Sequence, residues 1–250
     1  SMCPSSNDGD ETPYLYIWNG TDYVMDSDIL FGYPKTFFLS YEEGIRNYIS
    51  GNVGDELYVI KNSPYLDDNI YKLQIREIEE EKSYIDMFKL FKVTHSNDSM
   101  LITDNEFKNL YPIEANDLSD LVKPELSMSV YNEFNELTLT FDKVKTNKLI
   151  IESVMQQGEG SSKIEVFYMN QESKDWDLLT YIKPRNPYST KYLVNLPDTS
   201  KENFKLKMRY GKRVSMNSNN LGVLNAFNRE PYKIQELPLK SVIDIKSADD

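Results

Sequence analysis

Catalysis by a histidine in this 250-residue chain would have to use His95, because the sequence contains no other histidine. A Ser-His-Asp or Cys-His arrangement needs an imidazole that ordered neighbours hold in hydrogen-bonding geometry. His95 lies in the polar stretch VTHSNDSML, and the single cysteine, Cys3, precedes a segment of small, polar and chain-breaking residues. Such a segment cannot bury enough apolar surface to offset the entropy of ordering it. The sequence therefore disfavours nucleophilic catalysis and predicts that His95 is an ordinary surface residue.

Paired carboxylates are the catalytic arrangement that the composition still permits, as in glycoside hydrolysis. The chain has 40 acidic residues, and no feature of the sequence singles out two of them. The glycines are scattered without the spacing of a phosphate-binding loop or a dinucleotide fingerprint. The prediction is a protein that is not an enzyme and has no certain cofactor, with a hydrolase of this type as a second alternative.

Acid-rich turns offer oxygen ligands for a structural calcium ion, since calcium binds carboxylates and carbonyls of loops. The candidates are Asp26 and Asp28 in MDSDIL, and Asp117 and Asp120 in EANDLSD. Neither stretch has EF-hand spacing. The alternative is that these acids cap neighbouring backbone N–H groups in turns.

The overall charge restricts the partners of the protein. A net charge of −12 disfavours an electrostatic grip on nucleic acid or anionic lipid. No stretch approaches the ~20 apolar residues of a membrane-spanning helix, so contact with a membrane would require a lipid anchor.

Two loops nevertheless combine cationic or aromatic side chains with turn residues that keep a segment at the surface. KPRNPYST carries Arg185 and Tyr188, and YGKRVSMNSNNLG carries Lys212 and Arg213. Together they would form a cationic and aromatic rim for a glycan or another cell-surface protein, because Arg binds carboxylates and Tyr stacks on sugars. Alternatively, either loop could be a solvent-exposed connection between strands with no role in binding. Trp18 and Trp176 lie in predicted strands and are assigned to the core.

The elements that would position these residues are short strands separated by turns. YLYIWNGTDYVMD reads as a hairpin, with Asn19-Gly20 at its turn. In the second half, seven or eight strand-like segments recur at the spacing of a β-sandwich. Alternation is clear in ELTLTF, where Leu137, Leu139 and Phe141 share one face. One face of that sheet should be buried and the other wet, as in an antiparallel sheet.

Two resemblances add to this interpretation. Cys3 followed by a tether rich in Ser, Asn, Asp and Gly resembles the start of a prokaryotic lipoprotein, which implies lipid attachment at Cys3. The phrase WDLLTYIKPRNPYSTKYLVNLPDTSKENFKLKMRYG resembles the middle of a galactose-binding-like jelly roll in its order of Trp-bearing strand, Pro-rich turn and basic-apolar strand. That resemblance implies a β-sandwich and no catalytic motif.

The sequence thus predicts an all-β, mainly antiparallel protein of two β-rich domains, the second a galactose-binding-like jelly roll. The predicted parts are a disordered tether over 1–13, a β-rich domain over 14–124 with a linker at its end, the jelly roll over 125–230, and a tail of one or more strands over 231–250. The tail either returns to the first domain or begins another module. The predicted function is that of a non-catalytic binding or structural module at the cell surface or in secreted form. A carbohydrate-binding module is the first alternative.

Overall fold

The computed structural model describes residues 13–29, 56–77, 88–142, 144, 148–156, 163–185, 188–197, 204–224, 227 and 229–242. Within these residues the chain is mainly β, with one short α-helix, α2 (Ala115–Ser119), and one 3-10 turn, η1 (Ser218–Asn220). The predicted mainly antiparallel β fold is confirmed. Cys3 and its tether lie outside the described residues. No helix of the described part is long and apolar enough to cross a membrane.

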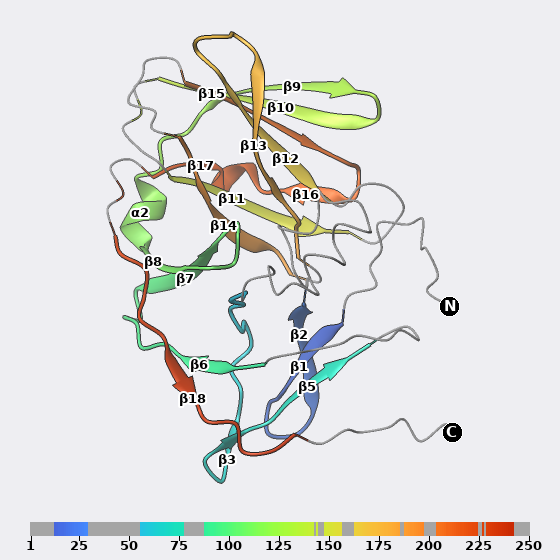
Figure 1. The fold of residues 1–250 in the computed structure, drawn as a ribbon, viewed down its shortest axis with the longest axis vertical. Helices are drawn as coiled ribbons and strands as arrows, with labels where there is room; N and C mark the ends of the chain where they lie inside the picture. The colour runs from blue at the N-terminus through green and yellow to red at the C-terminus, as the bar shows by residue number, and fades with distance from the viewer. Residues whose placement is uncertain are drawn as a thin grey trace, which may run out of the picture.

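A β-sandwich forms the larger part of the molecule (Figure 1). Its first sheet has five strands in the order β13-β12-β15-β10-β9. These strands are β9 (Glu125–Tyr131), β10 (Phe134–Phe141), β12 (Ile164–Met169), β13 (Trp176–Ile182) and β15 (Phe204–Tyr210). The second sheet has the order β16-β11-β14-β7-β8, and β17 also pairs with β11. Its strands are β7 (Ser99–Asp104), β8 (Leu110–Glu114), β11 (Lys148–Met155), β14 (Thr190–Asn195), β16 (Val214–Met216) and β17 (Gly222–Val223).

The core of the sandwich follows the alternation that the sequence predicts. Leu137, Leu139 and Phe141 of β10 are buried, and they oppose Met208, Leu206 and Phe204 of β15 in the antiparallel register. Since residues directly opposite in such a pair point to the same side, both strands contribute one apolar face to the core. Their other faces carry the polar and charged side chains.

The second sheet extends across the predicted boundary at residue 124. β7 and β8 pair with each other, and β7 pairs in parallel with β14 through Tyr192 and Thr103. A separate cluster that includes Ile102, Ile113 and Leu193 packs on this part of the sheet. The segment 99–114, which the sequence placed in the first domain, is therefore part of the sandwich in this structure.

A smaller three-stranded sheet lies beyond the sandwich, with the order β2-β1-β5. Its strands are β1 (Tyr14–Trp18), β2 (Tyr23–Asp28) and β5 (Leu73–Arg76). The predicted hairpin is confirmed, because β1 and β2 pair in antiparallel register. At its turn, Asn19 Oδ1 accepts from the backbone N–H of Thr21 and Asp22, each at 2.9 Å. Gly20 has a φ of +105°, a conformation that residues with a Cβ rarely adopt.

Two short strand pairs complete the described part. β3 (Leu66–Asp67) pairs with β4 (Ile70–Tyr71), and β6 (Leu90–Lys92) pairs with β18 (Gln235–Leu237). In Figure 1 the red C-terminal strand β18 runs along the green β6. The C-terminal strand β18 thus pairs with a strand of the region before residue 124.

Candidate functional site

The loop after β13 carries Arg185, which the sequence assigned to an exposed rim. The structure buries this residue to 2% exposure. Its Nε donates to Asp28 Oδ1 at 3.2 Å, and its Nη2 donates to Ser27 Oγ and to the Asp28 carbonyl. Arg185 therefore joins the sandwich to the end of β2, and its guanidinium is not offered to a partner.

Of the other three residues of the predicted rim, one is buried and two are exposed. Arg213 is 5% exposed, and its Nε donates to the carbonyl of Gln156 at 3.2 Å. Tyr188 and Lys212 are exposed. The two arginines thus support the loops from within, and only Tyr188 and Lys212 of the four predicted residues face solvent.

Three of the four acids proposed for calcium are engaged by backbone N–H groups or arginines. Asp26, which is fully buried, accepts from the backbone N–H of Lys61 through Oδ1 at 2.8 Å. Asp28 pairs with Arg185. Asp117 accepts from the N–H of Glu114 at 2.7 Å at the start of α2. The C-cap of that helix is Asp120. Within the described residues no group of three His, Cys, Asp or Glu side chains gathers.

His95 is exposed, and its Nδ1 lies 2.9 Å from the carbonyl of Ser96 and 3.3 Å from Ser99 Oγ. These are local contacts within one turn. They are the contacts of the surface residue that the sequence predicts.

Glu152 of β11 is the centre of a polar network near Tyr188. Its Oε1 accepts from Ser189 Oγ at 3.0 Å, and its Oε2 accepts from Asn217 Nδ2 at 2.9 Å and from Asn220 Nδ2. Lys191 forms an ion pair with it at 3.4 Å. Burial by itself would raise the pKa of Glu152, but the hydrogen bonds from Asn220 and Ser189 and the charge of Lys191 outweigh it and lower the pKa.

Replacing Glu152 with Gln should therefore change the acid sensitivity of the fold. A carboxylate whose folded pKa is lowered contributes stability above its unfolded pKa, and that contribution is lost as pH falls through the folded pKa. We expect Glu152→Gln to lower the free energy of unfolding by roughly 1.5–3 kcal/mol at pH 7. The difference from wild type should shrink below the ordinary carboxyl pKa of 4.5. Urea denaturation at several pH values measures this, and a pH-independent difference would contradict it.

Lys61 lies at the rim of the same region. Its Nζ donates to Thr190 Oγ1 at 2.6 Å and to the carbonyl of Ser189 at 3.0 Å. Although the residue is exposed, partial desolvation of the ammonium and the nearby charge of Arg185 lower the pKa of Lys61 to about 8, against the opposing charges of Asp26, Asp28 and Glu152. These contacts again connect the segment after residue 56 to the loop before β14.

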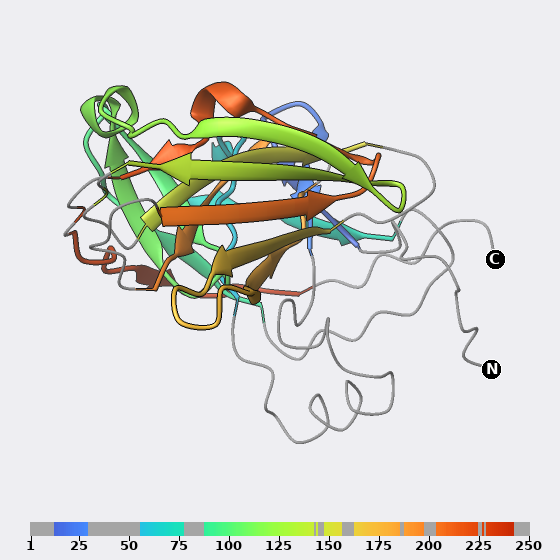
Figure 2. The ribbon, with the colours of Figure 1, turned by 90° about the horizontal axis from the view of Figure 1, so that it is seen from above.

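The outer face of the five-stranded sheet has a different character. In Figure 2 the sheet is seen from this side, from the green β9 through the orange β15 to the golden β12 and β13. Arg209 of β15 lies opposite both Glu136 of β10 and Glu165 of β12 in the strand register. Its guanidinium binds Glu136 Oε1 at 2.7 Å and lies 3.6 Å from Glu165 Oε2. Ion pairs thus connect the three middle strands of the sheet, β10, β15 and β12.

Aromatic rings and cations alternate across this face. The guanidinium of Arg209 lies 5.0 Å from the ring centre of Tyr131 on β9 and 5.4 Å from that of Phe167 on β12. Lys207 Nζ lies 5.1 Å from the ring centre of Phe167 and 4.8 Å from that of Trp176 on β13. We call these five residues, Tyr131, Arg209, Phe167, Lys207 and Trp176, the ring–cation row.

The charged members of this face are held in place by their neighbours. The side chain of Lys207 is 13% exposed and that of Glu136 is 14% exposed, although both belong to the outward face of the sheet. The rings beside them remove much of their solvent contact, which strengthens the interactions between them. A ligand that docked here would meet side chains already fixed in position.

This face was not predicted from the sequence, and the prediction for its tryptophan was wrong. Trp176 is half-buried on the outside of the sheet, not in the core as predicted. A usable signal was present in FKLKMRY, where Lys205, Lys207 and Arg209 alternate with apolar residues. In a chain of net charge −12, three cations on one side of one strand indicate a specialised face.

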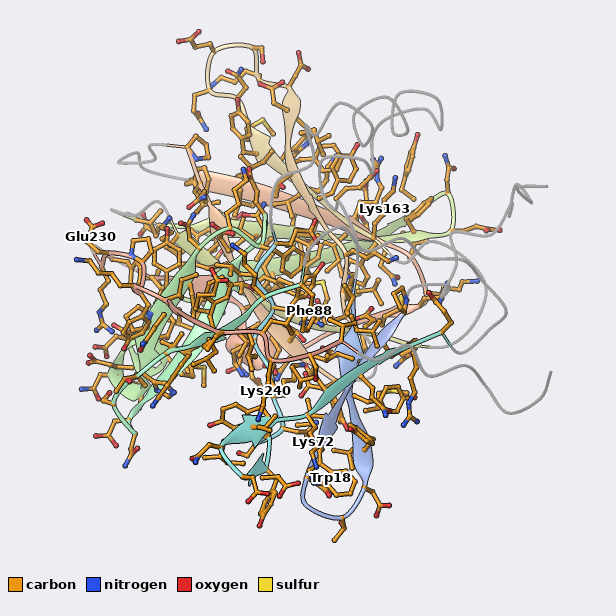
Figure 3. The ribbon with its side chains drawn as sticks, turned by 60° about the horizontal axis from the view of Figure 1, so that its bottom comes forward. Trp18, Lys72, Phe88, Lys163, Glu230 and Lys240 are labelled. Carbon is orange, nitrogen blue, oxygen red and sulfur yellow. The ribbon has the colours of Figure 1, made fainter. Side chains whose placement is uncertain are left out.

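Trp18 is also half-buried rather than a core residue. Its ring centre lies 5.2 Å from that of Tyr23 and 5.8 Å from Lys72 Nζ. Figure 3 shows Trp18 and Lys72 close together at the end of the small sheet. This smaller group lies on β1, β2 and the residue before β5, apart from the ring–cation row of the sandwich.

Comparison with known proteins gives a distant structural likeness. No family model matches the chain, and no curated protein matches its sequence. A mutant family 29 carbohydrate-binding module in complex with cellulohexaose aligns at 12% identity and a TM-score of 0.26, over 39% of this chain and 74% of that chain. A second mutant of this family aligns at 13% identity and a TM-score of 0.26, over 50% of this chain and 89% of that chain. This degree of similarity does not place the chain in that family.

Proposed function

We propose that this protein is a non-catalytic carbohydrate-binding module that holds a glycan chain against the outer face of its five-stranded sheet. The observation that carries this proposal is the ring–cation row, which runs from β9 to β13. Strands in a sheet lie about 4.8 Å apart, so a five-stranded face is roughly 19 Å wide. Such a face can support several consecutive sugar units.

The residue types of this face match the two kinds of surface that a sugar presents. Aromatic side chains combine a flat apolar surface with restricted motion, which suits the C–H faces of sugar rings. Arg209, Lys207 and Glu136 supply donors and acceptors for hydroxyl groups between the rings. Because their ion pairs already hold these side chains, less conformational entropy is lost when a ligand binds.

The charge of the face favours glycans that are neutral or acidic. Lys205, Lys207 and Arg209 lie along one strand, and the acids beside them, Glu136 and Glu165, are both engaged by Arg209. An extracytoplasmic location and lipid attachment at Cys3 are part of the same proposal, and their support comes from the sequence alone.

Trp176→Ala tests this function against a closely matched control. We expect the substitution to weaken binding to soluble polysaccharides, identified first on a glycan array, by at least about 10-fold, since truncating an aromatic side chain that anchors a ligand commonly costs about 2 kcal/mol or more. Trp18→Ala removes a half-buried tryptophan that also lies beside a lysine, but on the small sheet. It should leave the affinity unchanged.

Affinity electrophoresis and calorimetry with the best-binding polysaccharide measure both variants. Failure of the wild-type protein to bind any glycan would refute the proposed function. A loss of affinity in Trp18→Ala with none in Trp176→Ala would place the binding site on the small sheet instead.

A further inference from the structure

The edge strand β9 carries three apolar side chains on the side of the sheet that faces the core, and all three are exposed to solvent. Leu126 and Met128 pair with Leu139 and Leu137 of β10, so they lie on the same side of the sheet as the buried leucines. Leu139 is fully buried, but Leu126, Met128 and Val130 are 48%, 66% and 72% exposed. The second sheet therefore does not cover β9, and a stripe of three apolar side chains faces solvent.

This edge also lacks the features that usually prevent strands from pairing between molecules. Proteins protect free edges with proline, charged residues, bulges or very short strands. Among the other outer strands of the sandwich, β8 contains Pro112, β16 has three residues, and β13 contains Asp177 and has a register shift at Leu179. From Leu126 to Tyr131, β9 has neither proline nor a charged residue.

We propose that two copies of this chain associate through antiparallel pairing of their β9 strands, about a two-fold axis at Met128. In this register Met128 meets the partner's Met128, and Leu126 meets the partner's Val130. On the other face, Ser127 meets the partner's Ser129. On the face of Leu126, Met128 and Val130, every residue thus meets an apolar one, and the backbone groups of both edges gain hydrogen-bond partners.

The residue pattern of β9 favours a second copy as the occupant, because Leu-Ser-Met-Ser-Val is symmetric in residue type about Met128 and complements itself in the antiparallel register. The protein carries a net charge of −12, so most self-contacts would bring acids together. The proposed register places the one charged residue of β9, Glu125, opposite the partner's Tyr131. No like charges meet along the paired strands.

The dimer would join the two five-stranded sheets into one. Ser127, Ser129 and Tyr131 lie on the outer face of β9, beside the ring–cation row. Pairing would place the two rows on one continuous surface. A single strand pair buries less than the ~1,200 Å² of standard stable interfaces, so we expect weak, concentration-dependent association.

Sedimentation equilibrium over a range of protein concentrations tests the proposal. The wild-type chain should change from monomer to dimer as concentration rises. Met128→Lys and Met128→Glu should each weaken this association by at least about 10-fold, because like charges then meet at the two-fold axis. An equimolar mixture of the two variants should restore dimers, since opposite charges then face each other.

Leu239→Lys is the matched control, because Leu239 is 67% exposed and lies outside β9. It should associate as the wild type does. Thermal unfolding should be unchanged in all the variants, as their side chains are exposed. A wild-type chain that stays monomeric throughout, a dimer that persists in Met128→Lys, or a variant mixture that stays monomeric would each overturn the proposal.

Discussion

Arg185→Ala is expected to lower the free energy of unfolding by about 3–5 kcal/mol, the usual effect of removing one partner of a buried ion pair. Asp28, which is 1% exposed, would keep its charge in the interior without the guanidinium that now binds it at 3.2 Å. The substitution would also remove the donor to Ser27 Oγ and the stacking of the guanidinium 4.6 Å from the ring centre of Tyr58. All three contacts connect the sandwich to the region before it.

Chemical denaturation measures this loss, and Arg76→Ala is its control. Arg76 is exposed and lies 4.3 Å from the ring centre of Tyr16, so its removal should cost less than about 1 kcal/mol. The double variant Arg185→Ala/Asp28→Asn should recover part of the lost stability, because it no longer leaves a buried charge. Equal losses for Arg185→Ala and Arg76→Ala would show that the buried ion pair does not stabilise the fold.

Strand periodicity predicted the sandwich because it depends on local information. Leu137, Leu139 and Phe141 alternate with polar residues, and one side of such a strand must be buried whichever strand lies beside it. The hairpin at Asn19-Gly20 was predictable for a similar reason, since its turn chemistry lies within a few residues.

The role of Arg185 could not be predicted in this way. The residues around it are typical of an exposed loop, and this composition correctly describes Tyr188, three residues later. The partner of Arg185 is Asp28, 157 positions away in the sequence. Nothing in a single sequence indicates that two polar segments so far apart bury their charges against each other.

The linker-like stretch after residue 110 shows how a local break differs from a domain boundary. Pro112 lies within β8, whereas Asn116 and Asp117 do mark a change of structure, from β8 into the short helix α2. Asp117 accepts from the N–H of Glu114 at the start of that helix. The capping residues were read as a linker, whereas the strands on both sides of them belong to the sandwich.

Phe107→Ala is expected to destabilise the fold by about 3–5 kcal/mol, the usual cost of removing a buried phenylalanine ring. Phe107 follows β7, is 1% exposed and has a φ of +55°. A left-handed backbone costs a bulky residue roughly 1–2 kcal/mol, so burial of the ring outweighs the strain. The ring stacks on Tyr58 at 5.2 Å between centres and meets the edge of Tyr192 at 6.0 Å.

The loss of stability in Phe107→Ala should be uneven across the molecule. The carbonyl of Phe107 accepts from the N–H of Leu57 at 2.6 Å, so this turn holds the backbone around Leu57 against the sandwich. Native-state hydrogen exchange should therefore show faster exchange at Leu57 and Tyr58 than at the amides of β10, whose pairing partners are unchanged. Phe107→Leu, which keeps most of the apolar volume, should retain more than half of the lost stability. Equal loss of protection at Leu57 and in β10 of Phe107→Ala would contradict this role. It would mean that the ring stabilises the whole fold and does not specifically hold the backbone around Leu57.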